Sequence, residues 1–150
     1  MAFKLSNKSL KKMEGIDPAL EILAKHAISL SSVDFGISEG LRSVERQKKL
    51  VAQKRSQTMK SLHLEGKAID VFAFVDGEAV WELSVYDEIA DAFAMASRSQ
   101  GTPLVWGAAW SVPDIGQYNG TMEEAMHSYV DLRRSQSRRP FLDGPHFQLA

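Results

Sequence analysis

Several stretches of the chain repeat apolar residues at helical spacing. The clearest begins at Asp17, a residue suited to cap a helix, with Pro18 at the first helical position. The apolar residues that follow recur every three or four positions, as on the buried face of a helix: Leu20, Leu23, Ala24, Ala27 and Ile28. The same criterion predicts helices over residues 86–99 and 122–132, a short one from Ser6 or Asn7 to Met13, and one after Ser43 that contains Gln47, Leu50 and Val51.

Other stretches have the pattern of strands. Residues 33–37 alternate between apolar and other side chains, and residues 68–75 are apolar and rich in β-branched and aromatic residues. Asp76-Gly77 is a typical hairpin turn, so residues 79–81 are predicted to form the return strand. Shorter strands are predicted at residues 104–106 and 146–149.

The pattern indicates one small domain of the α+β class that covers residues 1–150. No stretch between the predicted elements has the composition of a linker, and no segment repeats. Residues 111–140 have the weakest pattern, with Pro, Gly and Asn ahead of the predicted helix. A single domain of this length can bury roughly 70% of the surface of its unfolded chain.

Composition narrows the possible functions. The chain has no cysteine, which excludes a disulfide framework and a thiolate metal site, so His, Asp or Glu would have to hold any metal. The formal net charge of −1 gives no general attraction to nucleic acid, although Arg133, Arg134, Arg138 and Arg139 form a basic cluster. Neither a signal peptide nor an apolar run of ~20 residues is present. We therefore expect a monomer made in the cytoplasm, with no nucleic-acid partner and no integral membrane segment.

Two stretches near opposite ends of the chain contain the donors of one metal site. The first holds His63 and Asp70, with Gly66 between them indicating a turn, so we expect His63 on a loop and Asp70 at the mouth of a strand. An ionised Asp70 among apolar neighbours is costly unless it is paired or metal-bound. The alternative is that Asp70 only caps a turn and that His63 is an exposed loop residue.

The second stretch holds Asp143 and His146 in a tight Asp-Gly-Pro-His turn. Pro145 stiffens the backbone before the imidazole, as a fixed ligand requires. A catalytic zinc site typically has three protein ligands and a fourth position open for water, and a nearby base must accept a proton from that water. Asp143 is the candidate base. Its alternative is an ordinary turn residue, because Asp-Gly pairs are common in turns.

These stretches also resemble a known family. Residues 61–70 match the pattern S-x-H-x-x-G-x-A-x-D of the zinc D,D-carboxypeptidase/dipeptidase family, and residues 143–147 resemble the D-x-P-H-F ending of its phage L-alanyl-D-glutamate peptidase branch. Residues 1–10, 40–47 and 106–110 also resemble that branch. The resemblance covers nearly the whole chain and implies a short antiparallel sheet with flanking helices, similar to the hedgehog and D,D-peptidase folds.

The resemblance implies roles for the candidate metal site. His63, Asp70 and His146 match the residues that bind Zn²⁺, and Asp143 matches the catalytic base. Members of the family that are D,D-peptidases often have Glu at the position of Asp143. The aspartate here therefore favours the phage branch.

Three other residues match positions near the substrate in that family. Arg42 matches an arginine that steadies the substrate carbonyl or the charge developing on it, a role suited to a fixed guanidinium. The alternative for Arg42 is a surface salt bridge with Glu39 or Glu45. Ser61 matches a residue near the substrate backbone, and Gln47 a polar position on the same helix as the arginine, for which a non-functional role is the alternative.

The function implied is that of a phage endolysin. Such an enzyme hydrolyses the L-Ala–D-Glu bond of the peptidoglycan stem peptide, once the host membrane is permeabilised. The alternatives are a D-Ala-D-Ala carboxypeptidase or dipeptidase with the same metal site, and a zinc-stabilised wall-binding module without catalysis. Glu123, Glu124 and His127 are further candidate metal contacts, with a solvated helix as the alternative.

Overall fold

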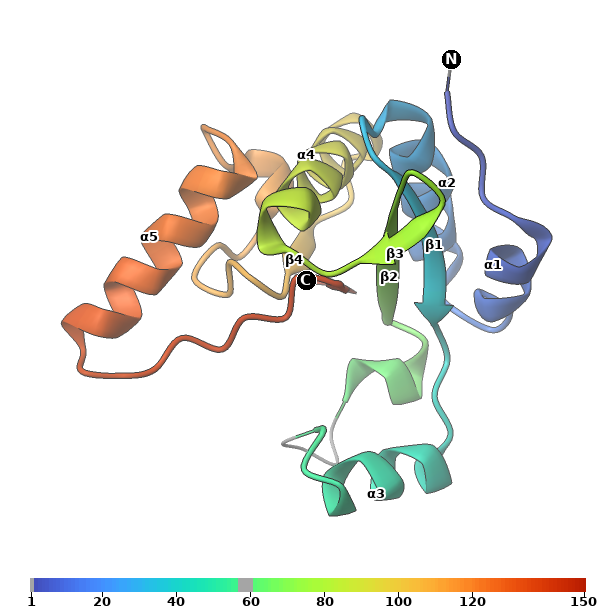
Figure 1. Ribbon diagram of the computed structural model, residues 1–150, viewed down its shortest axis with the longest axis horizontal. Coiled ribbons are helices and arrows are strands. Elements are labelled where there is room, and N and C mark those ends of the chain that lie inside the picture. Colours follow the sequence, from blue (N-terminus) through green and yellow to red (C-terminus); the bar gives the residue numbers. More distant parts are fainter. Residues whose placement is uncertain (1, 57–60) are drawn as a thin grey trace.

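The fold is an antiparallel five-stranded sheet with helices packed on it (Figure 1). The computed structural model describes residues 2–56 and 61–150. Its strands are β1 (Asp34–Glu39), β2 (Ala68–Val75), β3 (Glu78–Val80), β4 (Leu104–Trp106) and β5 (His146–Leu149). Its helices are α1 (Asn7–Lys12), α2 (Pro18–Leu30), α3 (Val44–Ala52), α4 (Leu83–Gln100) and α5 (Met122–Ser135), with short 3₁₀-helices η1 (Leu62–Glu65) and η2 (Ile115–Gln117).

The register of the sheet brings together residues that are far apart in the sequence. The strand order is β1-β2-β5-β4, with β3 paired to the end of β2. Asp70 of β2 lies opposite Glu39 of β1 on one side and His146 of β5 on the other. Opposed residues of antiparallel strands project to the same face of the sheet, so these three side chains form one row. A register shift between Ile37 and Glu39 adjusts β1 at this point, as bulges do beside functional sites.

The C-terminal strand is held firmly by the core. Phe147, which directly follows His146, is fully buried and stacks on Phe93 of α4 with a centroid distance of 4.1 Å. Trp106 of β4 lies opposite Phe147 across the strand pair, with ring centroids 6.5 Å apart, and donates from Nε1 to the carbonyl of Gly144 at 2.8 Å. Burying aromatic side chains of this size is a major stabilising contribution. His146 therefore projects from an anchored strand despite its place near the chain end.

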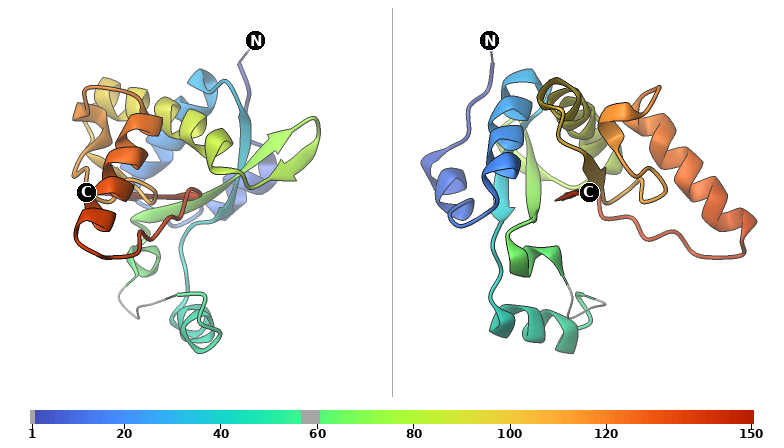
Figure 2. Two further views of the ribbon diagram at one scale, coloured as in Figure 1. Left: turned by 60° about the vertical axis from the view of Figure 1, so that its left-hand side comes forward. Right: turned by 180° about the vertical axis from the view of Figure 1, so that it is seen from behind.

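The helices pack on the sheet and against one another. α4 packs against α2 and α5, and α1 packs on β1. Figure 2 shows α3 and η1 away from this layer, at the end of the sheet where β2 begins. No helix within the described ranges is long and apolar enough to cross a membrane.

The α+β architecture and all the predicted strands and helices are confirmed, with differences at their ends. His63 lies in the one-turn helix η1 and not on an irregular loop, because Ser61 Oγ accepts from the His63 N–H at 3.2 Å and Gly66 ends the turn at φ 70°. Helix α4 begins at Leu83, three residues earlier than predicted. Its N-cap, Glu82, makes no side-chain capping bond, so the sequence carries no start signal there.

Candidate functional site

Three side chains from separate elements converge at one end of the sheet: His63 of η1, Asp70 of β2 and His146 of β5. Asp70 lies between the two imidazoles, with Oδ2 3.4 Å from His63 Nε2 and Oδ1 3.2 Å from His146 Nδ1. The rings meet edge to face at 5.2 Å. One donor atom from each residue lies within 4.8 Å of the other two. This is the arrangement that a single ion with three protein ligands requires.

A backbone carbonyl fixes the orientation of His63. The ring is almost completely buried, and Nδ1 lies 2.9 Å from the carbonyl oxygen of Gly40. Because a carbonyl only accepts, Nδ1 carries the proton and Nε2 presents its lone pair to Asp70. Nε2 is buried and makes no hydrogen bond with any of the described residues. A buried nitrogen lone pair beside a carboxylate is unfavourable unless a proton or a metal cation lies between them.

The second imidazole is oriented by Gln148. His146 Nε2 lies 2.8 Å from Gln148 Oε1, an oxygen that can only accept, so Nε2 is the protonated nitrogen. Nδ1 then faces Asp70 Oδ1, which brings two acceptors together unless a cation or a second proton lies between them. In metal sites, a hydrogen bond from the ring nitrogen that does not bind the metal commonly fixes the tautomer and orientation of a histidine ligand.

The charges of the cluster are strongly coupled. Burial raises the pKa of Asp70, but the imidazoles of His146 and His63 outweigh burial and hold the pKa well below its ordinary value. Burial lowers the pKa of His146, whereas the Asp70 carboxylate raises it above the ordinary value. Asp70 is therefore ionised at neutral pH. Two imidazole nitrogens and one carboxylate form a donor set suited to a metal ion with nitrogen and oxygen ligands.

Arg42 is buried beside this cluster. Its Nε and Nη2 donate to the two carboxylate oxygens of Glu39 at 2.7 and 3.0 Å, and Nη1 donates to Gln47 Oε1 at 2.7 Å. Nη2 also lies 3.6 Å from Asp70 Oδ2. Burial raises the pKa of Glu39, but Arg42 outweighs burial and lowers it, so the pair is ionic. Of the two partners in the alternative interpretation of Arg42, Glu39 forms the ion pair, and the pair is partly buried and not on the surface.

The cluster opens into a cleft of about 400 Å³ that Asp143 and Arg42 also line. Burial and the charge of Asp70 raise the pKa of the Asp143 carboxyl. The segment that carries it is held by an antiparallel contact in which the Asp143 N–H donates to the Gly107 carbonyl at 2.8 Å. A Cβ at Gly107 would lie 2.3 Å from the Asp143 carbonyl oxygen and 2.9 Å from His146 Cβ. Glycine is therefore what permits this close approach.

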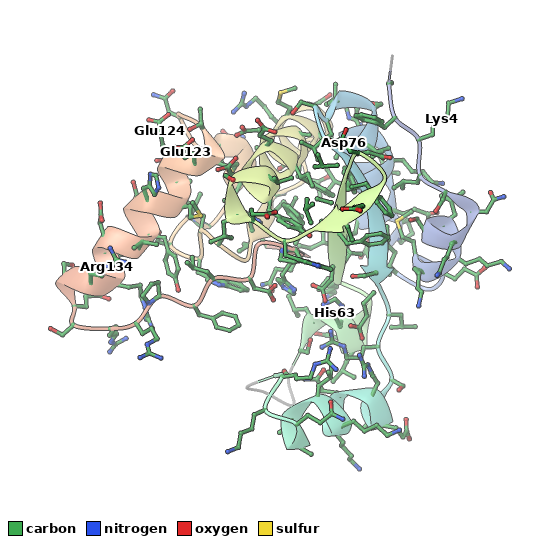
Figure 3. All side chains as sticks on the ribbon, viewed as in Figure 1. Lys4, His63, Asp76, Glu123, Glu124 and Arg134 are labelled. Carbon is green, nitrogen blue, oxygen red and sulfur yellow. The ribbon has the colours of Figure 1, made fainter. Side chains whose placement is uncertain are left out.

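The remaining predicted residues lie in different places. Ser61 lines the cleft, whereas Gln47 is fully buried and contacts Arg42 and Ser56 without being one of the residues that line it. Figure 3 shows Glu123 and Glu124 on α5, far from His63. Among the described residues, only His63, Asp70 and His146 form a cluster that can hold a metal, so His127 is also outside it.

Two contributors escaped prediction from the sequence. Gln148 is two residues after His146 in a strand, so the two share one face, and the strand period could have indicated it. Trp110 lines the cleft, with its ring 5.6 Å from that of His146 and 6.3 Å from that of Phe141. It lies after β4 in an irregular segment, where no periodicity indicates which side chains face the site.

Comparison with known proteins agrees with this geometry. The sequence profile of a family described as phage L-alanyl-D-glutamate peptidase matches residues 1–150. The L-alanyl-D-glutamate peptidase of Escherichia phage T5 is 30% identical over 138 residues, which covers 88% of this chain and 99% of that protein. The crystal structure of the Serratia marcescens L-Ala D-Glu endopeptidase ChiX is similar, with a TM-score of 0.74 and 32% sequence identity over 99% of this chain and 91% of that one.

Proposed function

This chain belongs to the phage L-alanyl-D-glutamate peptidase family, and we propose that it is a zinc-dependent endolysin that hydrolyses the L-Ala–D-Glu bond of the peptidoglycan stem peptide. The observation that carries the proposal is the buried Nε2 of His63, which makes no hydrogen bond with the described residues and lies 3.4 Å from Asp70 Oδ2 in a cleft that also contains a carboxyl with a raised pKa. The choice of scissile bond rests on the relatives, which are described as peptidases of the L-Ala–D-Glu bond.

The proposed zinc ligands are His63 through Nε2, Asp70, and His146 through Nδ1. These are the atoms left available by the hydrogen bonds to the Gly40 carbonyl and to Gln148. Neutral imidazoles and an ionised carboxylate are typical ligands of catalytic zinc, and the absence of cysteine leaves no softer alternative. When bound, zinc lowers the pKa of a coordinated water toward ~7 and polarises a substrate carbonyl.

Asp143 is the proposed general base. Because burial and the charge of Asp70 raise its pKa, its carboxylate holds a proton more firmly than an ordinary aspartate does. It would accept a proton from the attacking water and deliver it to the leaving amine. The Gly107 contact holds the segment of Asp143 close to that of His146.

Arg42 is proposed to stabilise the oxyanion. A guanidinium has five N–H groups, and three of those of Arg42 are used by Glu39 and Gln47, which leaves two without a hydrogen bond to the described residues. Its fixed partners prevent the group from reorienting during the reaction. Preorganised donors of this kind contribute several kcal/mol to transition-state stabilisation. Gln47 then positions the arginine and does not bind substrate itself.

We also propose where and in what form the enzyme acts. All the residues assigned above come from a single chain, so a monomer suffices. The phage origin of a relative supports synthesis in the host cytoplasm and action on the wall after the membrane is permeabilised. Expressed in a bacterial host, the enzyme should clear the culture only when a pore-forming agent is added. Clearing without that agent would contradict this localisation.

The test of the proposed function is digestion of purified peptidoglycan followed by identification of the new amino terminus. A new D-Glu amino group is expected, whereas released D-Ala would assign the D,D-carboxypeptidase activity instead. Asp143→Asn should lower kcat by about 10²-fold or more while metal binding persists. Asp131→Asn, at an exposed position on α5, is the matched control and should behave as wild type. Full activity of Asp143→Asn would refute the assignment of the base.

A further inference from the structure

We propose that Arg46 and Arg55 form a subsite in the cleft for a substrate carboxylate, the free carboxylate of the glutamate whose amine is released. This inference rests on the proposed function, because it names how the same site selects its substrate. Arg46 and Arg55 have no part in the proposed hydrolysis itself.

Both arginines line the cleft from one side. Arg46 and Leu50 are one turn apart on α3, and both contribute to the wall of the cleft. Arg55 lies in the turn after the helix, which is held by its own N–H donating to the Leu50 carbonyl at 2.8 Å. Figure 1 shows α3 at the same end of the sheet as η1, the element that carries His63. The two arginines thus line the same cleft as the proposed zinc ligands, from the α3 side.

Neither guanidinium has a strong partner among residues 2–56 and 61–150. Glu39 gives both its oxygens to Arg42, so Arg46 has only a 3.7 Å approach to Oε1 and is 43% exposed. The Arg55 side chain makes no hydrogen bond or ion pair with the described residues. By contrast, Arg42 donates three hydrogen bonds to Glu39 and Gln47 in a largely buried network. Arg46 and Arg55 are therefore free to bind an external anion.

The charges of the cleft otherwise have partners. Its described lining contains three carboxylates, those of Glu39, Asp70 and Asp143. Glu39 is paired with Arg42, Asp70 is the proposed metal ligand, and Asp143 is the proposed base. Trp110 and Phe141, which also line the cleft, are aromatic and cannot neutralise a charge. Apart from the proposed zinc ion and Arg42, which the reaction itself uses, the cations of the described lining are Arg46 and Arg55 on the α3 side.

The proposed substrate has such a group next to the bond that breaks. Glutamate has two carboxyl groups, and whichever of them joins the next residue, the other remains free. The leaving side of the scissile amide is therefore anionic unless that carboxyl is amidated. Arginine suits the task because its planar guanidinium can bind a carboxylate through two parallel hydrogen bonds. Two arginines on one side of the cleft would bind this carboxylate and so favour the free acid over its amide.

The test uses two synthetic acetylated peptides with an L-Ala–D-Glu bond, which differ only in whether the free glutamate carboxyl is an acid or a carboxamide. The wild-type enzyme should cleave the acid with a KM lower by about tenfold or more, the range of a charge-assisted hydrogen bond. In the double variant Arg46→Gln/Arg55→Gln, KM for the acid should rise to that for the amide. The kcat values and the KM for the amide should stay unchanged. Arg134→Gln is the matched control, because Figure 3 shows Arg134 on α5 far from His63.

Each outcome decides between the two proposals. If neither peptide is cut at the L-Ala–D-Glu bond, the proposed function fails, and the subsite with it. If wild type cuts both peptides with equal KM, or if the double variant keeps the preference for the acid, the enzyme stands and the carboxylate subsite is refuted. A fall in kcat for both peptides alike would assign the two arginines a structural role and would also refute the subsite.

Discussion

Removing the hydrogen-bond acceptor behind His146 should weaken metal binding without touching a ligand. In Gln148→Leu, the Nε2–H of His146 loses its partner at 2.8 Å, while the ring remains nearly buried with 11% of its side chain exposed. The imidazole is then no longer held in the form that presents Nδ1 to Asp70. Loss of an outer contact to a metal-binding histidine typically costs 10–100-fold in affinity, or about 1.4–2.7 kcal/mol. Leucine suits the strand position, so β5 should remain paired.

The assay is competition for Zn²⁺ against a chromophoric chelator at neutral pH. Gln148→Glu keeps an acceptor at the same position and should retain or strengthen binding, because a carboxylate makes a stronger hydrogen bond with the imidazole. Gln136→Leu, at an exposed position after α5, is the matched control for the polar-to-apolar change. Wild-type zinc affinity in Gln148→Leu would refute the reasoning, as would an equal loss in Gln148→Glu.

Three further predictions concern stability and alignment. Burial, followed by the charge of Glu123, raises the pKa of Asp87 to about 6. Between about pH 4 and about pH 6 the native state therefore keeps a proton that the unfolded state has lost, so the free energy of unfolding falls as pH rises through this range. Asp87→Asn should thus be the more stable protein at neutral pH by up to about 3 kcal/mol, and a denaturant series in which the two proteins keep equal stability there would contradict this. Glu39→Gln leaves the Arg42 guanidinium without its carboxylate and should lower the free energy of unfolding by about 1.5–3 kcal/mol, because Gln47 and the new amide oxygen still accept from it. Because the pKa of Glu39 is lowered, the stability that the pair contributes is present above the ordinary glutamate pKa and is lost as pH falls through the lowered one, which acid-unfolding curves of wild type and variant will check. Gly107→Ala should displace the Asp143 segment and lower kcat by on the order of 10²-fold, and zinc affinity and KM are measured beside kcat. A normal kcat would mean that the close approach of Gly107 to Asp143 is not needed.

The elements of this fold were predictable because their patterns are local. The spacing of Leu20, Leu23 and Ala27 defines one buried helix face, and the apolar run at residues 68–75 defines a central strand. The start of α4 was not predictable, since Glu82 makes no capping bond. Strand register was not predictable either: nothing near Asp70 in the sequence indicates that it lies opposite His146, 76 residues later.

The site was predictable as far as its chemistry appears in residue types. His63, Asp70 and His146 were identified from motif order, and the structure brings them together. The residues that orient them were not, because a backbone carbonyl such as that of Gly40 has no signature in the sequence. Gln47 is an intermediate case. Its position on a helix was predictable, but its burial and its hydrogen bond to the Arg42 guanidinium depend on how α3 packs.

We propose that one metal ion, held by His63, Asp70 and His146, drives cleavage of the L-Ala–D-Glu bond. The most direct measurement is a Zn²⁺ titration of chelator-stripped protein, following new D-Glu amino termini released from peptidoglycan. Activity should be absent at the start and reach its plateau at about one equivalent of zinc, and Asp70→Ala should stay inactive throughout. Full activity of the stripped protein, or recovery of Asp70→Ala at about one equivalent, would contradict the account.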